Sequence, residues 1–263
     1  MSVRRLLLPI ALVLVACGGS DDAAPSTDTG ADPVPTAGSV LFRGWVTDGA
    51  TDEVVAGGEL CVLEPEQDAE PCATTDADGM VEWTWLSPSE SNFTAQFTLD
   101  GYTTLLYLGH YDDEVATEYS RAMETEGAVS ITYRVFTTSI MSWWLGKGEI
   151  TMDDGAGHIF VMVTGATEDT ALDGMTASLS DGSGTVVYWG ADALTLNPGL
   201  VASSESGSIV IGNVAPGNHT LNVTHDTLVC DNVRAWLTDA PNTYTLPVQA
   251  DSVTVIHISC AAE

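Results

Sequence analysis

The sequence predicts an all-β protein: two tandem antiparallel β-sandwich domains that follow a disordered N-terminal tether. Two observations support this fold class. Apolar and polar residues alternate along many short segments, and Gly, Asp, Asn and Pro repeatedly interrupt the alternation. The clearest alternation covers residues 92–99 and 218–224. Because successive side chains of a strand point to opposite faces, each of these segments has one face for a core and one for solvent.

An internal repeat predicts that the two domains are of one type. Residues 74–89 align without gaps to residues 202–217, and the alignment places Gly79 on Gly207. An equal interval separates two further pairs, Val46 from Gly57 and Val163 from Gly174. The second unit also has a longer excursion, between Gly174 and Gly207.

The first 16 residues have the pattern of an export signal. Arg4 and Arg5 precede a short apolar stretch that ends in Leu14-Val15-Ala16-Cys17. This ending resembles the lipobox of bacterial lipoproteins, a family in which the cysteine is acylated and becomes the mature N-terminus. The resemblance implies a lipoprotein signal peptide over 1–16 and lipidation, with palmitate, at Cys17. In that family an Asp directly after the cysteine implies retention in the inner membrane, so Gly18 favours the outer membrane. The alternative interpretation of the whole segment is an ordinary cleaved signal peptide with a chance cysteine.

The segment after the cysteine predicts a tether. Residues 18–38 contain four Asp, three Pro and almost no large apolar side chain, so they cannot bury enough surface to offset the entropy of ordering. We therefore assign 17–38 to the acylated Cys and a disordered acidic tether.

Without the leader the chain has 37 acids against five bases, a balance of −32. Such a charge excludes nucleic acid as an electrostatic partner.

The remaining chain divides into a first β-sandwich over 39–137, a connector over 138–155 and a second β-sandwich over 156–263. Within 111–127, three residues at helical spacing predict a short helix, namely Val115, Tyr119 and Met123. Residues 131–136 are expected to form the last strand of the first domain, and 139–145 a short helix packed on a sheet.

Both units resemble the carboxypeptidase regulatory-like domain, a transthyretin-like β-sandwich. The first copy carries the family pattern in Arg43-Gly44-Trp45-Val46, Gly57–Leu60, Thr75-Asp76-Ala77-Asp78-Gly79, Pro88 and Gly101-Tyr102. The second carries it in Gly157–Val161, Gly174–Ala177, Ser206-Gly207 and Pro216-Gly217, without the Asp of the turn and the late Gly-Tyr. The resemblance covers most of 40–108 and 156–260. It implies a module that accompanies enzymes or receptors and is seldom catalytic.

Four cysteines other than Cys17 predict two disulfides, because an even number in an exported chain favours pairing. Spacing alone allows three connectivities. The repeat favours one bridge in each domain, Cys61 with Cys72 and Cys230 with Cys260. A zinc site is the competing interpretation, but the sequence has no Cys-x-x-Cys-like ligand spacing.

Other patterns point to little chemistry. His219, His225 and His257 could together make a three-ligand metal site, but no His-x-His or His-Glu-x-x-His spacing supports it, and ordinary strand positions are favoured. Asp76-Ala77-Asp78-Gly79 begins like a calcium loop, but its twelfth position is Ser87, so a turn is favoured. The sequence also has no nucleophile elbow, phosphate loop or dinucleotide fingerprint. We therefore expect no catalytic residue, no metal and no cofactor.

The leading functional hypothesis is a non-enzymatic cell-envelope lipoprotein whose β-sandwiches serve as spacer, adhesion or interaction modules. Its expected partners are the membrane, through the lipid anchor, and an envelope protein or polysaccharide. A carbohydrate-binding surface lipoprotein is the alternative, since tryptophans can stack on sugars, and Trp189 is the one we expect to be exposed. A metal-dependent hydrolase is the third hypothesis.

Overall fold

The fold is known from a computed structural model that describes residues 40–63, 72–85, 91–111, 113–167, 170–191, 195–236 and 240–262. The predicted signal peptide, Cys17 and the predicted tether lie outside the described residues. Seven strands belong to the first half: β1 (Val40–Asp48), β2 (Glu59–Leu63), β3 (Cys72–Thr74), β4 (Met80–Trp85), β5 (Ser91–Thr98), β6 (Thr104–Tyr111) and β7 (Val129–Val135). Nine belong to the second: β8 (Gly157–Gly165), β9 (Thr176–Leu179), β10 (Thr185–Trp189), β11 (Leu196–Asn197), β12 (Ile209–Val214), β13 (Gly217–Thr224), β14 (Leu228–Arg234), β15 (Thr243–Val248) and β16 (Ser252–Ala262). The helices are α1 (Asp113–Glu126) and α2 (Thr138–Lys147).

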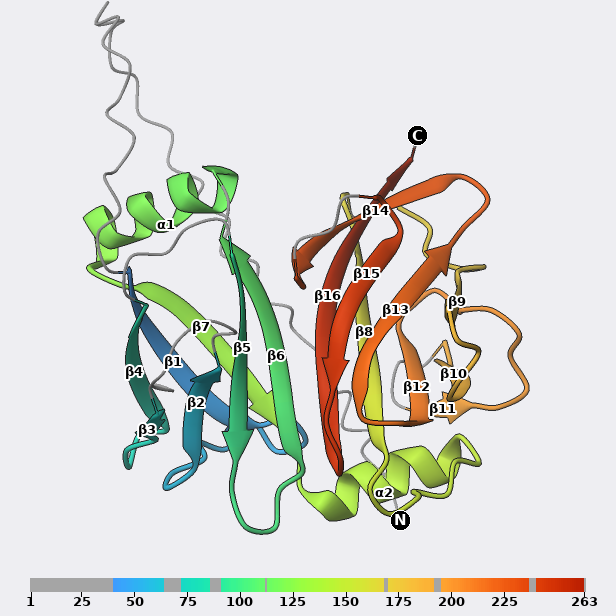
Figure 1. Ribbon diagram of the computed structural model, residues 1–263, viewed down its shortest axis with the longest axis horizontal. Coiled ribbons are helices and arrows are strands. Elements are labelled where there is room, and N and C mark those ends of the chain that lie inside the picture. The colour runs from blue at the N-terminus through green and yellow to red at the C-terminus, as the bar shows by residue number, and fades with distance from the viewer. Residues whose placement is uncertain are drawn as a thin grey trace, which may run out of the picture. The chain divides into compact units, whose positions relative to one another are not determined.

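The all-β prediction is confirmed. Within the described residues the strands form two three-stranded sheets, β4-β1-β7 and β15-β13-β9, and one ten-stranded sheet. In the large sheet the strands run β11-β10-β12-β8-β16-β6-β5-β2-β3, with β14 paired to β16. Figure 1 shows the first half, in blue and green, beside the second, in yellow to red. Each half is a sandwich because a small sheet packs against its part of the large one.

The two halves repeat one pattern of strand pairing, as the sequence repeat predicts. In the first half β1 pairs antiparallel with β4 and parallel with β7; in the second, β8 pairs antiparallel with β12 and parallel with β16. The series β2-β5-β6 likewise corresponds to β9-β13-β15. Gly79 and Gly207, which the alignment superposes, have φ of 71° and 67°; Gly79 directly precedes β4, and Gly207 lies two residues before Ile209, the first residue of β12. Both glycines are required there, because left-handed backbone is costly for other residues.

The described strand pairs are mainly antiparallel, as predicted, but three of them are parallel. Strand β1 pairs with β7 in parallel, and β16 pairs in parallel with both β8 and β6. Parallel neighbours need a crossover instead of a tight turn. Helix α1 lies in the connection from β6 to β7, and the last strand of each half returns beside its first. Period-2 alternation shows which face of a strand is buried but not the direction of its neighbour.

The halves are joined by one continuous sheet. Residues 252–255 of β16 pair in parallel with residues 104–107 of β6, so the large sheet crosses from one half to the other. Side-chain hydrogen bonds reinforce this seam. Gln96 Nε2 donates to Gln249 Oε1 at 2.9 Å and Trp236 Nε1 to the Phe93 carbonyl at 3.1 Å. His110 Nδ1 lies 3.0 Å from the Ala235 carbonyl. The described strands therefore belong to one compact unit. The exact domain boundaries within it stay a prediction.

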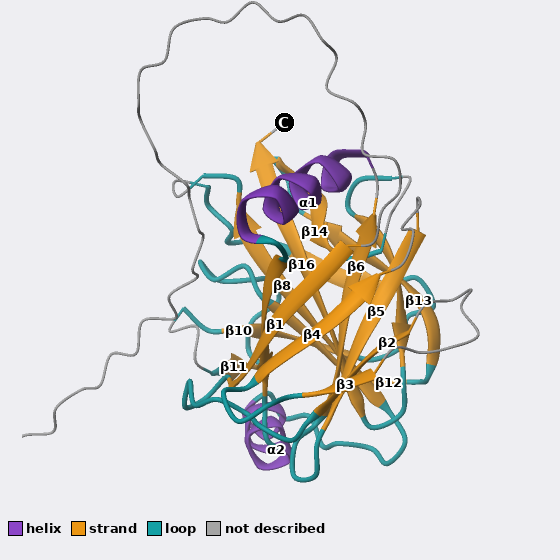
Figure 2. Cartoon of the chain, turned by 90° about the vertical axis from the view of Figure 1, so that its left-hand side faces the viewer, coloured by secondary structure: helices purple, strands orange, loops and turns teal. Residues whose placement is uncertain are grey.

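Both predicted helices are present and lie at opposite ends of the first half's strands (Figure 2). Helix α2 begins after Thr137, whose hydroxyl accepts the Ile140 N–H as an N-cap. It buries Met141 and Leu145 against the core. Helix α1 packs through Tyr119 and Met123, two of the residues whose spacing predicts it. Among the described residues, neither helix is long and apolar enough to cross a membrane.

Candidate functional site

Both predicted disulfides are present, and each joins directly opposed residues of antiparallel strands. Cys61 pairs with Cys72 across β2 and β3, and Cys230 pairs with Cys260 across β14 and β16. Their environments differ: Cys72 is exposed and Cys61 half-buried, whereas Cys230 and Cys260 are 1% and 0% exposed. One bridge therefore lies at the surface and the other in the core.

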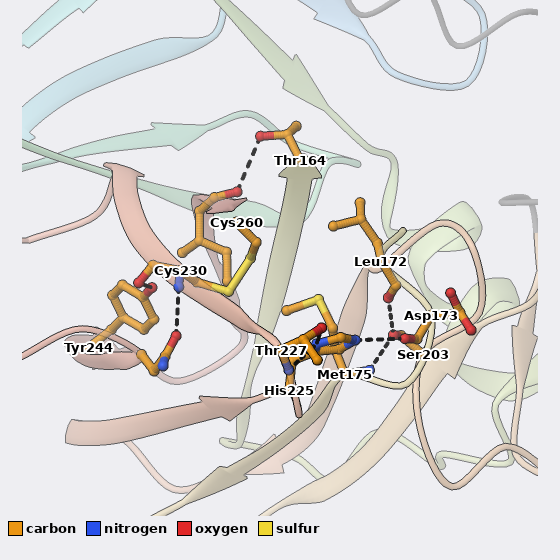
Figure 3. The surroundings of a disulfide bond; sticks show 12 residues. Thr164, Leu172, Asp173, Met175, Ser203, His225, Thr227, Cys230, Tyr244 and Cys260 are labelled. Atoms are coloured by element: carbon orange, nitrogen blue, oxygen red, sulfur yellow. Dashed lines mark hydrogen bonds between the residues drawn. A yellow bond between two sulfur atoms is a disulfide. The ribbon is translucent and has the colours of Figure 1, made fainter. Parts of the chain in front are cut away.

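Beside the buried Cys230–Cys260 bridge, which we call the inner bridge, two side chains form hydrogen bonds with the backbone of Cys230 and hold β14 in place (Figure 3). The Tyr244 hydroxyl donates to the Cys230 carbonyl at 2.8 Å, and Asn242 Oδ1 accepts the Cys230 N–H at 2.7 Å. Burial raises the pKa of Tyr244, with a smaller contribution from the Asp231 carboxylate, so its hydroxyl stays protonated and remains a donor. This region has the organisation of a structural anchor.

The histidines of the candidate metal triad do not form one site. His219 Nδ1 contacts Asp181 at 3.1 Å and its Nε2 donates to the Ala215 carbonyl, while His225 Nε2 donates to the Asp173 carbonyl. His257 lies on β16, paired with β8 and β14. Among the described residues, one potential ligand group has its atoms within 4.8 Å, namely Glu59 with Cys61 and Cys72. Both of its sulfurs are in the disulfide, so the group does not offer two thiolate ligands.

The calcium-like fragment is a turn in the structure, as the sequence favours. One carboxylate oxygen of Asp76 accepts the N–H groups of Asp78 and Met80, both at 2.9 Å. Gly79 completes the turn with its positive φ. This is the usual way in which an Asp side chain stabilises a turn entering a strand.

The tryptophans whose side chains are described do not form an exposed row on one sheet face. Trp83 and Trp189 are 4% and 9% exposed, so the prediction that Trp189 is exposed is wrong. Trp189 packs instead against Trp144 of α2 and Phe160 of β8. The sequence places it in the longer excursion of the second unit, but Trp144 of α2 packs against it there. Among the tryptophans whose burial the structure describes, the exposed ones are Trp143 on α2 (48%) and Trp45 on β1 (36%), which belong to different elements.

A buried histidine that sequence reasoning did not single out lies where the connector enters the second half. His158, at the start of β8, is 1% exposed, and its Nδ1 accepts the Asn213 N–H at 3.2 Å. Burial lowers its pKa, although the Asp153 and Asp251 carboxylates act in the opposite direction. The side chain of Asn213 also contacts the connector: its Oδ1 accepts the Asp153 N–H, and its Nδ2 donates to the Thr151 carbonyl. A neutral His158 therefore helps to hold the connector against β12.

A small, mainly apolar pocket of about 50 Å³ lies between α1 and strands of both halves. Among its lining residues are Phe93, Tyr107, His110, Tyr119, Tyr133 and Val233. A cavity needs roughly 10–15 Å³ to hold one water molecule, so this one has room for a few waters.

Comparisons with known proteins do not identify a family. No protein-family model matches the chain, and no curated protein matches it. Similar solved structures include the TIE protein of Bacillus anthracis, at 11% identity over 85% of this chain and 34% of that one, with a TM-score of 0.26. A minor pilin of Streptococcus agalactiae is 10% identical over 85% and 96% of the two chains, with a TM-score of 0.26. A catechol 1,2-dioxygenase of Acinetobacter sp. is 10% identical over 41% and 55%, with a TM-score of 0.30.

The chain spans about a third of the length of the Bacillus protein and about half of the dioxygenase. At these TM-scores the similarities carry no argument about function. The resemblance to carboxypeptidase regulatory-like domains stays a prediction from the sequence.

Proposed function

We propose that this protein is a lipid-anchored component of a bacterial cell envelope, in which the fused β-sandwiches act as a non-enzymatic spacer and interaction module. The observation that carries the proposal is the order of segments at the N-terminus: a short apolar stretch, the Leu14–Cys17 motif, and then an acidic, Pro-containing segment before β1. Acyl chains on Cys17, at about 0.8 kcal/mol per buried CH₂, would give stable anchoring.

Two structural features support an extracytoplasmic, mechanical role. The two disulfides suit an oxidising compartment. The seam between β6 and β16 joins two sandwiches into one compact unit, so a surface on either half would be presented by that same unit. A flexible segment as long as residues 18–38 has a root-mean-square span of about 25 Å, which would place that unit clear of the lipid surface.

The repeated strand pairing supports a finer proposal, that each half is a carboxypeptidase regulatory-like domain. Within this proposal the large negative charge keeps the module from anionic surfaces and favours partners with basic or neutral contact surfaces.

Metabolic labelling tests the anchor. Radiolabelled palmitate should enter the full-length protein in a bacterial host and should not enter Cys17→Ser, which should also leave the membrane fraction. Ser20→Ala, three residues further on, is the matched control and should be labelled like the wild type. Equal labelling of the wild type and Cys17→Ser would refute the proposal.

Carbohydrate binding is the second candidate function, and Trp143 is the observation in its favour. Its ring is 48% exposed on α2, and Lys147 Nζ lies 5.5 Å from the ring centroid. An exposed indole can stack on a sugar face. In affinity gels containing envelope polysaccharide, the wild type should be retarded and Trp143→Ala should not. Val201→Ala, which alters an 89% exposed apolar residue elsewhere, is the control. Unchanged retardation of Trp143→Ala would exclude this site.

A further inference from the structure

The Cys61–Cys72 disulfide lies at the last strand of the large sheet. Strand β3 has three residues and pairs on one side with β2, with Cys61 directly opposite Cys72. Cys72 is exposed and Cys61 is half-buried. Thiols exchange with disulfides by direct attack on a sulfur, so access to that sulfur governs the rate. The other disulfide, with both cysteines at 1% exposure or less, is closed to such attack.

We propose that Cys61–Cys72 is a site of thiol–disulfide exchange that accepts low-molecular-weight thiols, whereas Cys230–Cys260 is a permanent structural bond. The incoming thiolate attacks Sγ of Cys72, the exposed residue of the pair, and forms a mixed disulfide. The Cys61–Cys72 bond breaks, and Cys61 Sγ leaves with the electron pair and takes a proton from water. A second thiol then attacks the mixed disulfide, which releases Cys72 as a thiol and the two external thiols as their disulfide.

The fold tolerates this opening because β3 has a second attachment. Thr75, directly after β3, donates its N–H to the Gly58 carbonyl at 2.8 Å, and its hydroxyl accepts the Gly58 N–H at 3.0 Å. Its carbonyl also accepts the Gly57 N–H at 2.9 Å. On its other side β2 is held by β5 along its whole length. Exchange at the exposed residue therefore requires neither detachment of β3 nor unfolding of the core.

Glu59 slows the exchange. It lies on β2, and one of its carboxylate oxygens and both sulfurs are within 4.8 Å of one another. A carboxylate at this distance repels the approaching thiolate and disfavours the thiolate that leaves on Cys61. The Coulomb interaction of two unit charges at this separation in water corresponds to about a fourfold change in rate. We infer that Glu59 sets the reactivity of this bond without taking part in the bond changes.

Timed alkylation of the folded, full-length protein tests the proposal. The oxidised protein is incubated with reduced glutathione, samples are blocked with iodoacetamide, and the modified cysteines are mapped by mass spectrometry. Cys61 and Cys72 should be alkylated at least tenfold faster than Cys230 and Cys260. Urea below the unfolding transition should leave the first rate unchanged and accelerate the second. Equal rates, or equal acceleration by urea, would overturn the proposal.

The role of Glu59 has its own pair of variants. Glu59→Gln should react about fourfold faster at low salt, and the difference should shrink as salt screens the charge. Glu205→Gln, which removes an exposed carboxylate in the second half, is the matched control and should react like the wild type. Identical rates for the two variants would refute the inference about Glu59.

Discussion

Removing the inner disulfide should destabilise the protein more than removing the outer one. We compare the double variants Cys230→Ala/Cys260→Ala and Cys61→Ala/Cys72→Ala, which leave no lone thiol at either bridge. The bridged cysteines are 30 residues apart in the first pair and 11 in the second. Loop-closure entropy alone then contributes about 3.6 and about 2.8 kcal/mol respectively at 25 °C.

Burial widens this difference. Replacing Cys230 and Cys260, which are 1% and 0% exposed, removes two sulfurs from the second core and leaves a void. Voids of this kind add about 1 kcal/mol, so the inner pair should cost about 4–5 kcal/mol in the free energy of unfolding. The outer pair leaves no buried void and should cost about 3 kcal/mol.

Urea unfolding of the oxidised proteins, followed by tryptophan fluorescence, measures both values. If the outer pair proves equally or more destabilising, then core burial does not distinguish the two bridges and the reasoning fails.

Two further predictions concern His158 and the repeated glycine. Because the pKa of His158 is lowered in the folded protein, the unfolded chain takes up a proton at a higher pH than the folded one. The free energy of unfolding should therefore have its full value above pH 6.5, the pKa of an unperturbed histidine, and decrease below it by at most about 1.4 kcal/mol per pH unit. His158→Asn should flatten this slope in urea titrations from pH 7.5 to 5, and an unchanged slope would contradict the assignment. Gly79→Ala should cost about 2–4 kcal/mol, because φ is 71° and the added Cβ would lie 2.8 Å from the Val46 carbonyl. Gly101→Ala, with φ of 85° but open space, should cost about 1–2 kcal/mol, and thermal melts that rank the two in the opposite order would refute the steric argument.

The sequence by itself determined the local features of this protein. Alternation over residues 92–99 predicts β5, in which Phe93, Ala95 and Phe97 are all buried. The equal intervals between glycines predict a repeated unit, and the repeated strand pairing agrees with it. These features depend on neighbouring residues along the chain, where side-chain direction and backbone φ follow directly from residue type. Pairing each cysteine within its own unit also needed only the repeat.

Tertiary structure decided which residues far apart in the sequence lie next to each other. Pairing of β6 with β16 joins strands about 150 residues apart, and no periodicity within either strand indicates that partner. The burial of Trp189 depends on α2 folding over it, and the depth of His158 depends on β12 and β16 on either side. The contrast between the two disulfides has the same origin. Both were readable as cysteine pairs, but their exposure follows from the face of the sheet on which each bridge lies. Cys61 lies on the face of β2 opposite the buried Leu60 and Val62, whereas Cys230 and Cys260 face the second core.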